Sequence, residues 1–311
     1  MDHRGEKRYN NYTAYIKNTF GERVQKISLN TGFLCPNRDG TKGVGGCTYC
    51  NISTFSPTYC KPKKSIRQQL DEGISFFSTK YKSQKYLAYF QAYTNTYAEI
   101  ELVKDYYLQA VSHPDVIGLV IGTRPDCISA DLLDFLEELA KQYYISLEFG
   151  VESTLDKTLD LVNRCHTYQE TVDAYEMSKG RGLHLGAHLI LGLPGESRDE
   201  IMSHAITVSK LPIDSIKLHH LQVVKGTEMA KQLKENPGMF DLFGIDEYVE
   251  FVAEFVGRLR EDIIIERFIS ESPPNKLIAP KWNGLKNFEV TAKIDKKLIE
   301  KDIWQGKYYF S

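Results

Sequence analysis

The feature that most constrains this chain is a glycine-rich loop with three cysteines, LNTGFLCPNRDGTKGVGGCTYCN, at residues 29–51. Eleven residues separate Cys35 from Cys47, and two separate Cys47 from Cys50. The glycines let the backbone fold tightly and turn several N–H groups toward one point. Because three converging thiolates favour soft metals, the loop predicts either a zinc ion or an iron–sulfur cluster.

The number of cysteines favours the cluster over zinc. A structural zinc site needs four closed protein ligands, usually from two Cys-x-x-Cys pairs or from one pair with two histidines. This loop offers one such pair and the lone Cys35, so a fourth ligand is missing. Three cysteines with a vacant fourth position fit a 4Fe–4S cluster with one open iron. We therefore predict that Cys35, Cys47 and Cys50 are the metal ligands.

Disulfides and simple burial are the alternative uses of these thiols. The chain has 6 Cys in 311 residues and no apolar N-terminal segment, which indicates the reducing cytoplasm. Burial of small apolar thiols is a weak explanation for a loop rich in Gly, Asn, Asp and Thr. The other three cysteines, Cys60, Cys127 and Cys165, are interpreted as buried or incidental thiols. For Cys60, an auxiliary ligand or a radical-quenching thiol is the alternative.

The bulk properties exclude little beyond a membrane protein. No run approaches the roughly 18 apolar residues that span a bilayer, so no membrane partner is expected. The net charge of −2 does not indicate a nucleic-acid binder, although a local basic patch would vanish in that total. No oligomeric state follows from the sequence.

Apolar runs and amphipathic stretches alternate along most of the chain. Strands are predicted at 24–29, 86–92, 116–121, 145–149, 185–191 and 215–221. Helices are predicted at 12–20, 61–80, 98–111, 129–143, 155–162, 168–179 and 198–209. This order predicts an α/β fold with a parallel sheet covered by helices. Periodicity alone leaves open whether the sheet is a barrel or doubly wound.

The two ends of the chain are predicted to differ from this core. Residues 1–23 are expected to form an arm and a helix, and residues 24–225 the core barrel. Residues 226–311 are expected to form a C-terminal α/β extension packed on the core. Within it, helices are predicted at 246–259 and near 292–301, and an apolar strand at 263–268.

Polar residues follow the strands where ligands bind in parallel β/α folds, at the carboxyl ends. They are Gln91, Tyr93, Thr94, Asn95, Thr123, Arg124, Asp126, Glu148, Glu152, Ser153, His188, His219, His220 and Gln222. Their number predicts that the metal faces a pocket able to hold an amino acid and a ribose. For Arg124 and Asp126, an internal ion pair and substrate contacts both remain open. Adjacent residues on a strand point to opposite faces, so at most one of His219 and His220 faces the pocket.

The chain resembles a known family over nearly its whole length. The ordered motifs CPNRDG, GGCTYCN, FQAYTNT, GTRPD, LEFGVES, NRCH and LILGLPGE resemble those of radical S-adenosylmethionine (SAM) enzymes. They are most similar to the small bacterial YhcC/YtqA-like group, which is related to the radical domain of the Elongator acetyltransferase subunit. The resemblance implies a partial (β/α)6 radical SAM barrel. It also implies a 4Fe–4S cluster on the three cysteines, whose fourth iron binds the methionine part of SAM and whose electron releases a 5′-deoxyadenosyl radical.

The resemblance also implies cofactor-binding roles, but no catalytic residue. Gln91, Tyr93 and Asn95 stand where related enzymes carry a Gly-Gly-Glu motif for the methionine amine, which this chain lacks. Glu152 resembles a ribose ligand and Arg164 a ligand of the methionine carboxylate, with an exposed ion pair as the alternative. His188 is assigned a position near the ribose, and the alternative is a core histidine. Gly192 and Gly195 are assigned a position beside the adenine, and the alternative is a simple turn before a helix.

The sequence is compatible with three functions, two of them enzymatic and one not. The first is a radical enzyme acting on the 5-substituent of a tRNA wobble uridine, for example in maturation of a carboxymethylaminomethyl side chain. The second is a radical enzyme acting on a small metabolite or a tetrapyrrole, and the third is a non-catalytic iron–sulfur or zinc protein. The expected partners are a one-electron donor of the flavodoxin or ferredoxin type and tRNA. Two basic clusters are candidates for phosphate contacts. The first comprises Lys61, Lys63, Lys64 and Arg67, and the second comprises Lys293, Lys296, Lys297 and Lys301. The alternative is that both are solvated helix faces.

Overall fold

One parallel sheet forms the centre of the protein in the computed structural model, which describes residues 6–51, 56–79 and 84–310. Its strands are β1 (Val24–Leu29), β2 (Lys85–Phe90), β3 (Val116–Thr123), β4 (Tyr144–Glu152), β5 (His184–Leu191), β6 (Ser215–His220) and β8 (Ile264–Arg267). They lie in the order β1-β2-β3-β4-β5-β6-β8, and every neighbouring pair is parallel. The predicted α/β architecture is confirmed.

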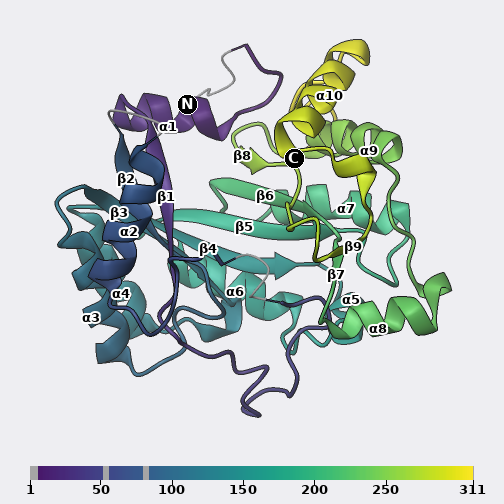
Figure 1. The fold of residues 1–311 in the computed structure, drawn as a ribbon. Helices are drawn as coiled ribbons and strands as arrows, with labels where there is room; N and C mark the ends of the chain where they lie inside the picture. The colour runs from purple at the N-terminus through teal and green to yellow at the C-terminus, as the bar shows by residue number, and fades with distance from the viewer. Residues whose placement is uncertain (1–5, 52–55, 80–83, 311) are drawn as a thin grey trace.

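Helices cover the outer face of this sheet (Figure 1). The described α-helices are α1 (Tyr12–Phe20), α2 (Ile66–Ser78), α3 (Ile100–Val111), α4 (Ala130–Ala140), α5 (Asp156–Leu161), α6 (Tyr168–Ser178), α7 (Arg198–Ser209), α8 (Glu228–Glu235), α9 (Ile245–Arg258) and α10 (Asn287–Glu300). Two of them do not lie on the sheet, since α8 packs beside β7 and α10 packs on α9. The apolar faces of the covering helices and the outward side chains of the strands form one large buried core. Burial of this apolar surface is the main force that holds the helices on the sheet.

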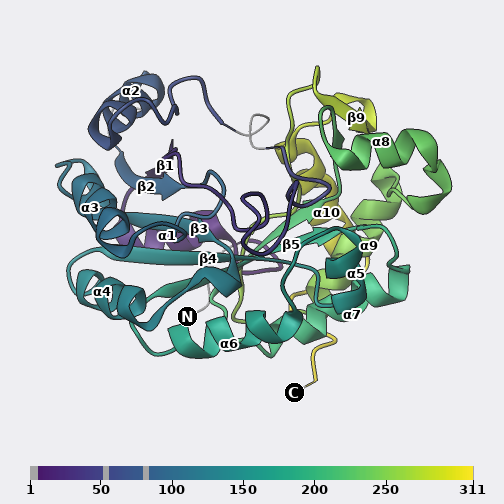
Figure 2. The ribbon, with the colours of Figure 1, turned by 90° about the horizontal axis from the view of Figure 1, so that it is seen from below.

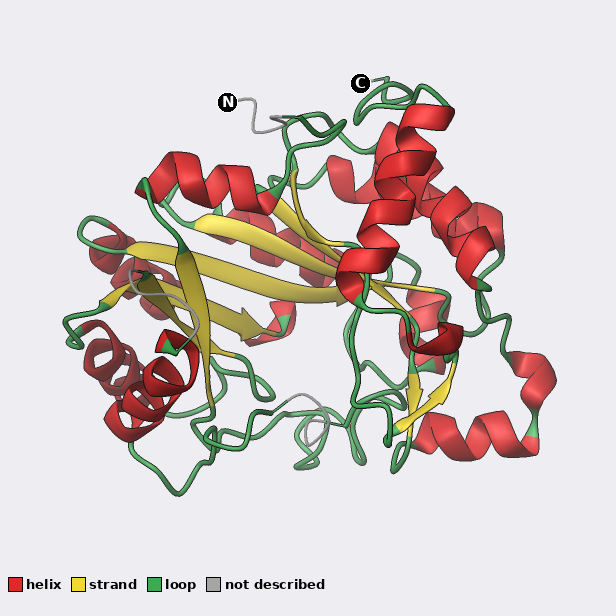
Figure 3. Cartoon of the chain, turned by 45° about the horizontal axis from the view of Figure 1, so that its top comes forward, coloured by secondary structure: helices red, strands yellow, loops and turns green. Residues whose placement is uncertain are grey.

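The sheet is a partial barrel, because its edge strands β1 and β8 do not pair with each other in the strand order. Side chains nevertheless link these edges, since Lys26 Nζ on β1 lies 2.7 Å from Glu266 Oε2 on β8. The segment before α1 adds a backbone contact, in which Ile265 N donates to the Asn10 carbonyl at 2.8 Å. Figure 3 shows the resulting curved sheet flanked by helices.

Several element boundaries differ from the sequence expectation. Helix α2 begins at Ile66 rather than at residue 61, because Ser65 and Gln68 form a capping box that fixes its first turn. Helix α10 begins at Asn287 rather than near 292. Its first turn is capped by the Glu289 carboxylate, which accepts from Lys286 N at 2.9 Å.

The sequence analysis missed α8 and a short antiparallel pair. The strands of this pair are β7 (Val223–Val224) and β9 (Leu277–Ala279), and they lie apart from the main sheet. The strand expected at 263–268 is confirmed as β8, which completes the main sheet from beyond residue 225. Whether residues 226–311 act as a separate extension stays a prediction. Within the described ranges, no helix combines the length and the apolar character that a membrane crossing requires.

Candidate functional site

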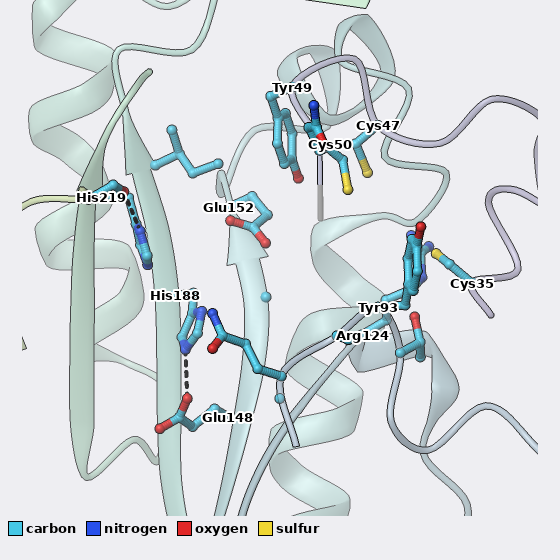
Figure 4. Close-up of a pocket in the computed structure, with 18 of the residues that line it drawn as sticks. Cys35, Cys47, Tyr49, Cys50, Tyr93, Arg124, Glu148, Glu152, His188 and His219 are labelled. Carbon is cyan, nitrogen blue, oxygen red and sulfur yellow. Dashed lines mark hydrogen bonds and ion pairs between the residues drawn. The ribbon is translucent and has the colours of Figure 1, made fainter. Parts of the chain in front are cut away.

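One large pocket opens at the carboxyl ends of the strands and gathers most of the polar residues expected there. Its empty space, with its open mouth included, is about 1530 Å³. Seen from below, the loop that follows β1 lies across these strand ends, between strands β1–β3 and helices α5 and α8 (Figure 2). The pocket therefore has one wall made of the cysteine loop and a floor made of strand residues (Figure 4).

All three predicted ligands, Cys35, Cys47 and Cys50, line the pocket. Cys50 N donates to the Cys47 carbonyl at 2.9 Å, so a tight turn holds these two thiols side by side, while Cys35 lies farther off (Figure 4). Among the described residues, no three His, Cys, Asp or Glu side chains are grouped as ligands of a single metal ion. A zinc ion would need its thiolates about 2.3 Å from one point, whereas a cluster takes them on different irons. A set of three thiols suits a cluster, because each thiolate binds a different iron.

The cysteine loop is held in shape by the segment Asn163–His166. Asn163 Nδ2 donates to the Gly46 carbonyl at 2.9 Å, and the Asn37 side chain donates back to the Asn163 carbonyl. Gly46 itself has φ +82°, and a Cβ there would meet Arg38 Nε at 2.7 Å. A side chain at this position would be strained by the positive φ and would push the Arg38 guanidinium aside.

The environment of the Cys50 thiol favours its neutral form. Burial, and after it the neighbouring Cys47, raises the pKa of Cys50 to about 11. Because a thiol must lose its proton to bind a metal, binding at Cys50 is coupled to proton release.

Arg164 lies beside Cys47, and Glu152 lies beside Arg164. Arg164 Nη2 donates to the Gly150 carbonyl at 2.6 Å, and its Nη1 lies 3.7 Å from Cys47 Sγ. The Glu152 carboxylate is 3.8 Å from Arg164 Nη2, which is an ion-pair contact but not a hydrogen bond. Burial raises the pKa of Glu152, while Arg164 and Arg124 oppose that shift.

The backbone of β4 aims Glu152 into the pocket. The pairing of β4 with β5 shifts register between Gly150 and Glu152, and Glu152 has φ +66°. A Cβ on Gly150 would lie 2.5 Å from Glu152 Oε1 and 2.7 Å from Arg164 Nη2. Glycine at this position therefore leaves the room that the Glu152–Arg164 pair occupies.

Several buried donors at this end have no hydrogen-bond partner within the described part of the chain. They are Arg164 Nε, Arg124 Nη1 and the Tyr49 hydroxyl. All three residues line the pocket, and Figure 4 shows the Tyr49 ring beside Cys50. Buried donors without partners are costly, so they indicate that the pocket binds a polar ligand.

The loop after β2 supplies two of its three predicted residues. Gln91 and Tyr93 line the pocket, and the Arg38 guanidinium lies 5.6 Å from the centre of the Tyr93 ring. Asn95 is instead buried behind the pocket, where its Nδ2 donates to the Gly122 carbonyl at 2.8 Å. Its contacts hold the loop to β3, and its cofactor-binding role stays a prediction.

We call the buried ionic network beneath the pocket the charged floor, and it comprises Lys26, Glu148, His188, Lys217 and Glu266. Of these residues, Glu148 and His188 line the pocket itself. The Glu148 carboxylate accepts from Lys26 Nζ at 3.1 Å, from His188 Nε2 at 2.9 Å and from the Lys217 ammonium. Although burial raises the pKa of Glu148, Lys217 and Lys26 hold it well below its usual range. Burial lowers the pKa of Lys217 to about 8 against the attraction of Glu148 and Glu266.

The contact with Glu148 fixes the state of His188. Burial, and then Lys217, lowers the pKa of His188 to about 4, so the ring is neutral at pH 7. Its Nε2 carries the proton that is donated to Glu148, which leaves Nδ1 as an acceptor. Because His188 lines the pocket while bonded to the charged floor, both roles considered from the sequence fit its position.

The remaining candidates lie in different places. Gly192 has φ +93° in the turn after β5 and is not among the residues that line the pocket, so its adenine contact stays a prediction. Arg124 and Asp126 form a buried ion pair at 2.8 Å, and only Arg124 of the two lines the pocket. His219 and His220 both line the pocket, so the expectation that at most one of them faces it is wrong, because β6 ends at His220 and the strand alternation stops there. The His219 ring lies beside that of His188, and the His220 ring stacks on Trp282 at 4.0 Å. Burial raises the pKa of both Cys60 and Cys127 to about 12, as expected of buried thiols.

Sequence reasoning missed Tyr49, Lys217 and Arg267, all of which belong to the site or its floor. Tyr49 stands inside the Cys47–Cys50 motif, so its spacing was a usable signal. Lys217 stands between two apolar residues of β6, Ile216 and Leu218, and Arg267 ends the last strand of the sheet. A charged residue within a buried strand was the local signal for both of them.

A 4Fe–4S cluster with SAM fits the residues of this pocket. The three thiols form a soft donor set on one wall, which suits iron. SAM carries a carboxylate, an amine and ribose hydroxyls, and the unpartnered Arg164 and Arg124 donors with the Glu152 carboxylate are complementary to these groups.

Comparisons with known proteins agree with this picture. The family model of the Radical SAM superfamily matches residues 34–207, and that of the Radical_SAM C-terminal domain matches residues 213–300. The protein YtqA of Bacillus subtilis is 34% identical over 304 residues, which cover 98% of this chain and 94% of YtqA. A tRNA uridine(34) acetyltransferase of Methanocaldococcus infernus is 28% identical over 140 residues, or 44% of this chain and 25% of that protein.

One solved structure has a clearly similar fold. The archaeal Methanocaldococcus infernus Elp3 with an N-terminal deletion (1–46) superposes with a TM-score of 0.66 at 18% sequence identity. The match covers 91% of this chain and 64% of that chain. At this identity the similarity concerns the fold, and it agrees with the partial barrel expected from the sequence.

Proposed function

Because this chain belongs to the radical SAM superfamily, whose members use a 4Fe–4S cluster and SAM, we propose that Cys35, Cys47 and Cys50 hold that cluster and that the enzyme modifies the 5-substituent of a tRNA wobble uridine. The observation that carries the cofactor assignment is the wall of three thiols beside buried, unpartnered donors of Arg164 and Arg124. When bound, the cluster and SAM supply a 5′-deoxyadenosyl radical that abstracts hydrogen from a substrate.

The residues of the pocket bind and orient the cofactor. Arg164 presents its Nε–H to the methionine carboxylate, while its other nitrogens stay bonded to the protein. Glu152 accepts hydrogen bonds from the ribose hydroxyls, and Gln91 and Tyr93 face the methionine amine. Since Arg164 and Glu152 are already held by Gly150 and the β4 register shift, little ordering is required on binding.

The charged floor serves the substrate side of the reaction. His188 offers Nδ1 as an acceptor, and its orientation is fixed by Glu148. The Glu148 carboxylate is itself saturated by Lys26 and Lys217, so it holds His188 without taking a proton at neutral pH. A rigid floor of this kind positions a substrate group close to the cofactor and limits the entry of water.

The support for tRNA comes from the relatives rather than from surface charge. One matched relative is named as a tRNA uridine(34) acetyltransferase, and its match, at 28% identity, covers 44% of this chain. The basic cluster on α10 is largely neutralised, since Lys297 and Lys301 both pair with Glu250. In the first cluster, Lys64 and Arg67 pair with Glu72 and Asp71, which leaves Lys61 and Lys63 as the candidates for phosphate contacts. The electron donor is proposed to be a small flavodoxin or ferredoxin.

The substrate assignment is tested with tRNA that carries 5-carboxymethylaminomethyluridine at the wobble position, deuterated in the substituent. Cluster-loaded enzyme, SAM and reductant are added, and the digested nucleosides and the 5′-deoxyadenosine are analysed by mass spectrometry. We expect a changed wobble nucleoside and deuterium in the 5′-deoxyadenosine, both absent with tRNA whose wobble uridine is unmodified. Cleavage of SAM without either change would contradict the tRNA assignment and leave the cofactor assignment intact.

A further inference from the structure

A second group of residues lines the pocket away from the cysteines, at the carboxyl ends of β6 and β8. It contains His219, Arg267 and Ser270. In Figure 4, His219 lies on the far side of Glu152 from Cys47 and Cys50. The family motifs discussed above do not include these residues, so their arrangement calls for its own explanation.

Arg267 is a cation with unused hydrogen-bonding capacity. Its Nη2 lies 3.3 Å from His219 Nε2, whereas its buried Nε has no hydrogen-bond partner among the described residues. The nearby buried carboxylates, Glu148 and Glu266, are already shared by Lys26 and Lys217. A guanidinium that lines a pocket in this state is suited to bind a carboxylate.

The charge balance at the bottom of the pocket also favours an anion. The three cations Lys26, Lys217 and Arg267 face the two carboxylates of Glu148 and Glu266, which leaves one positive charge. The histidines add none, because burial lowers the pKa of both His188 and His219. Glu271 also lines the pocket, but it is exposed and its Oε1 accepts from Asn287 N at 2.6 Å. A buried excess charge is costly unless a ligand neutralises it.

His219 holds Arg267 in place through a defined tautomer. Arginine only donates, so His219 Nε2 must be the acceptor of the Arg267 contact. The proton of the neutral ring is then on Nδ1, which donates to Ser270 Oγ at 2.6 Å. His219 is thus a positioning residue that fixes the direction of the guanidinium.

We propose that Arg267, oriented by His219 and Ser270, binds a carboxylate group of the substrate at the end of the pocket opposite the cysteines. This inference rests on the proposed function, because the carboxymethylaminomethyl substituent named there ends in a carboxylate. It deepens that function by assigning the recognition of this group to one side chain. An enzyme with this subsite selects uridines whose 5-substituent is acidic over those whose substituent ends in an amine.

The test compares two nucleosides, one of which carries on its amine a carboxymethyl group that the other lacks. Binding of 5-carboxymethylaminomethyluridine and of 5-aminomethyluridine is measured by titration calorimetry, with the cluster and SAM bound and no reductant present. The wild type should bind the carboxylated nucleoside about tenfold more tightly or better, as a charge-assisted hydrogen bond provides. Arg267→Gln should remove that preference, and Lys141→Gln, which removes an exposed cation just after α4, should keep it. Melting temperatures confirm that both variants are folded.

Two further variants separate recognition from general structural damage. Arg267→Lys keeps the charge but loses the planar fork, so it should retain part of the preference. His219→Gln should weaken binding of the carboxylated nucleoside while leaving binding of 5-aminomethyluridine unchanged. A general loss of structure would weaken both nucleosides equally, and that result for His219→Gln would contradict its positioning role.

The outcomes distinguish this inference from the proposed function. Equal binding of the two nucleosides, unchanged in Arg267→Gln, would overturn the subsite and leave the tRNA assignment standing. If neither nucleoside binds, N-methylglycine and methylamine are compared by saturation-transfer NMR. Binding of N-methylglycine that is lost in Arg267→Gln would support the subsite and contradict the uridine substrate. Absence of carboxylate-dependent binding in both comparisons would overturn the subsite.

Discussion

The two ends of the pocket are built in different ways. The cysteine end, with Cys35, Cys47 and Cys50, comes from one loop whose ligands lie within 16 residues of sequence. The charged floor comes from single positions on β1, β4, β5, β6 and β8, separated by up to 240 residues between Lys26 and Glu266. The cysteine end therefore depends on a local motif, and the charged floor depends on the register of the whole sheet. Mutations should separate these two kinds of dependence.

The largest expected effect is at the cysteine end. Cys47→Ala should abolish cluster incorporation while the protein remains folded, because the ligand lies in a loop that does not support the sheet. Iron and sulfide content and visible absorbance after anaerobic reconstitution measure this effect. Cys60→Ala is the matched control, since Cys60 lines the same pocket and is interpreted as a buried thiol. Loss of the cluster in Cys60→Ala would make Cys60 a ligand and contradict the three-cysteine site.

A substitution in the charged floor should instead lower the stability of the folded protein. Glu148→Gln leaves the buried Lys26 and Lys217 with Glu266 as their remaining carboxylate, which should cost about 3–5 kcal/mol in free energy of unfolding. Urea unfolding of the cluster-free protein measures this loss. Glu138→Gln, which breaks an exposed pair with Lys141, should stay within about 0.5 kcal/mol. Equal losses in the two variants would show that the charged floor does not hold the sheet.

A substitution of Arg164 tests the proposed binding of SAM, between the cysteine end and the charged floor. Arg164→Gln should weaken SAM binding about 10- to 150-fold, the range for loss of one or two charge-assisted hydrogen bonds. The dissociation constant is measured on cluster-loaded protein and expressed per cluster, so that any change in iron content is removed from the comparison. Unchanged affinity for SAM would mean that the unpartnered Nε of Arg164 does not serve the methionine carboxylate.

The smallest expected effect concerns His188 and pH. Its pKa is lowered from 6.5 to about 4, so the unfolded chain binds more protons than the folded protein between these values. Stability contributed by the neutral ring is therefore present above pH 6.5 and is lost as pH falls toward 4. Between pH 6 and 5, His188→Gln should reduce the slope of unfolding free energy against pH by about 1.2 kcal/mol per pH unit. An unchanged slope would contradict a neutral, buried His188.

The difference between the two ends also explains what the sequence could predict. Cys35, Cys47 and Cys50 were found because their spacing is itself the signal of a soft-metal site. The place of Glu152 after a strand already predicted that it lies near the pocket. Its role, and the position of Arg164, required the resemblance, since their contact is not visible in the sequence. Gln91 and Tyr93 reached the pocket with them, whereas Asn95 turned toward the Gly122 carbonyl.

The charged floor and the carboxylate subsite were not predictable in the same way. Lys217 and Arg267 become neighbours only when β6 pairs with β8, and β8 follows β6 by more than forty residues. The strand at 263–268 was expected from its apolar run, but its place in the sheet was not. Local pattern predicted the elements, and only the tertiary register placed their charges together.

The central claim is that the cysteine end cleaves SAM, and one anaerobic measurement tests it most directly. Reconstituted protein is reduced with dithionite, and 5′-deoxyadenosine formed from SAM is quantified beside the Cys47→Ala variant. We predict cluster-dependent 5′-deoxyadenosine from the wild type and none from the variant. A wild-type protein that takes up zinc, or that holds a cluster and forms no 5′-deoxyadenosine even when tRNA is present, would contradict the account.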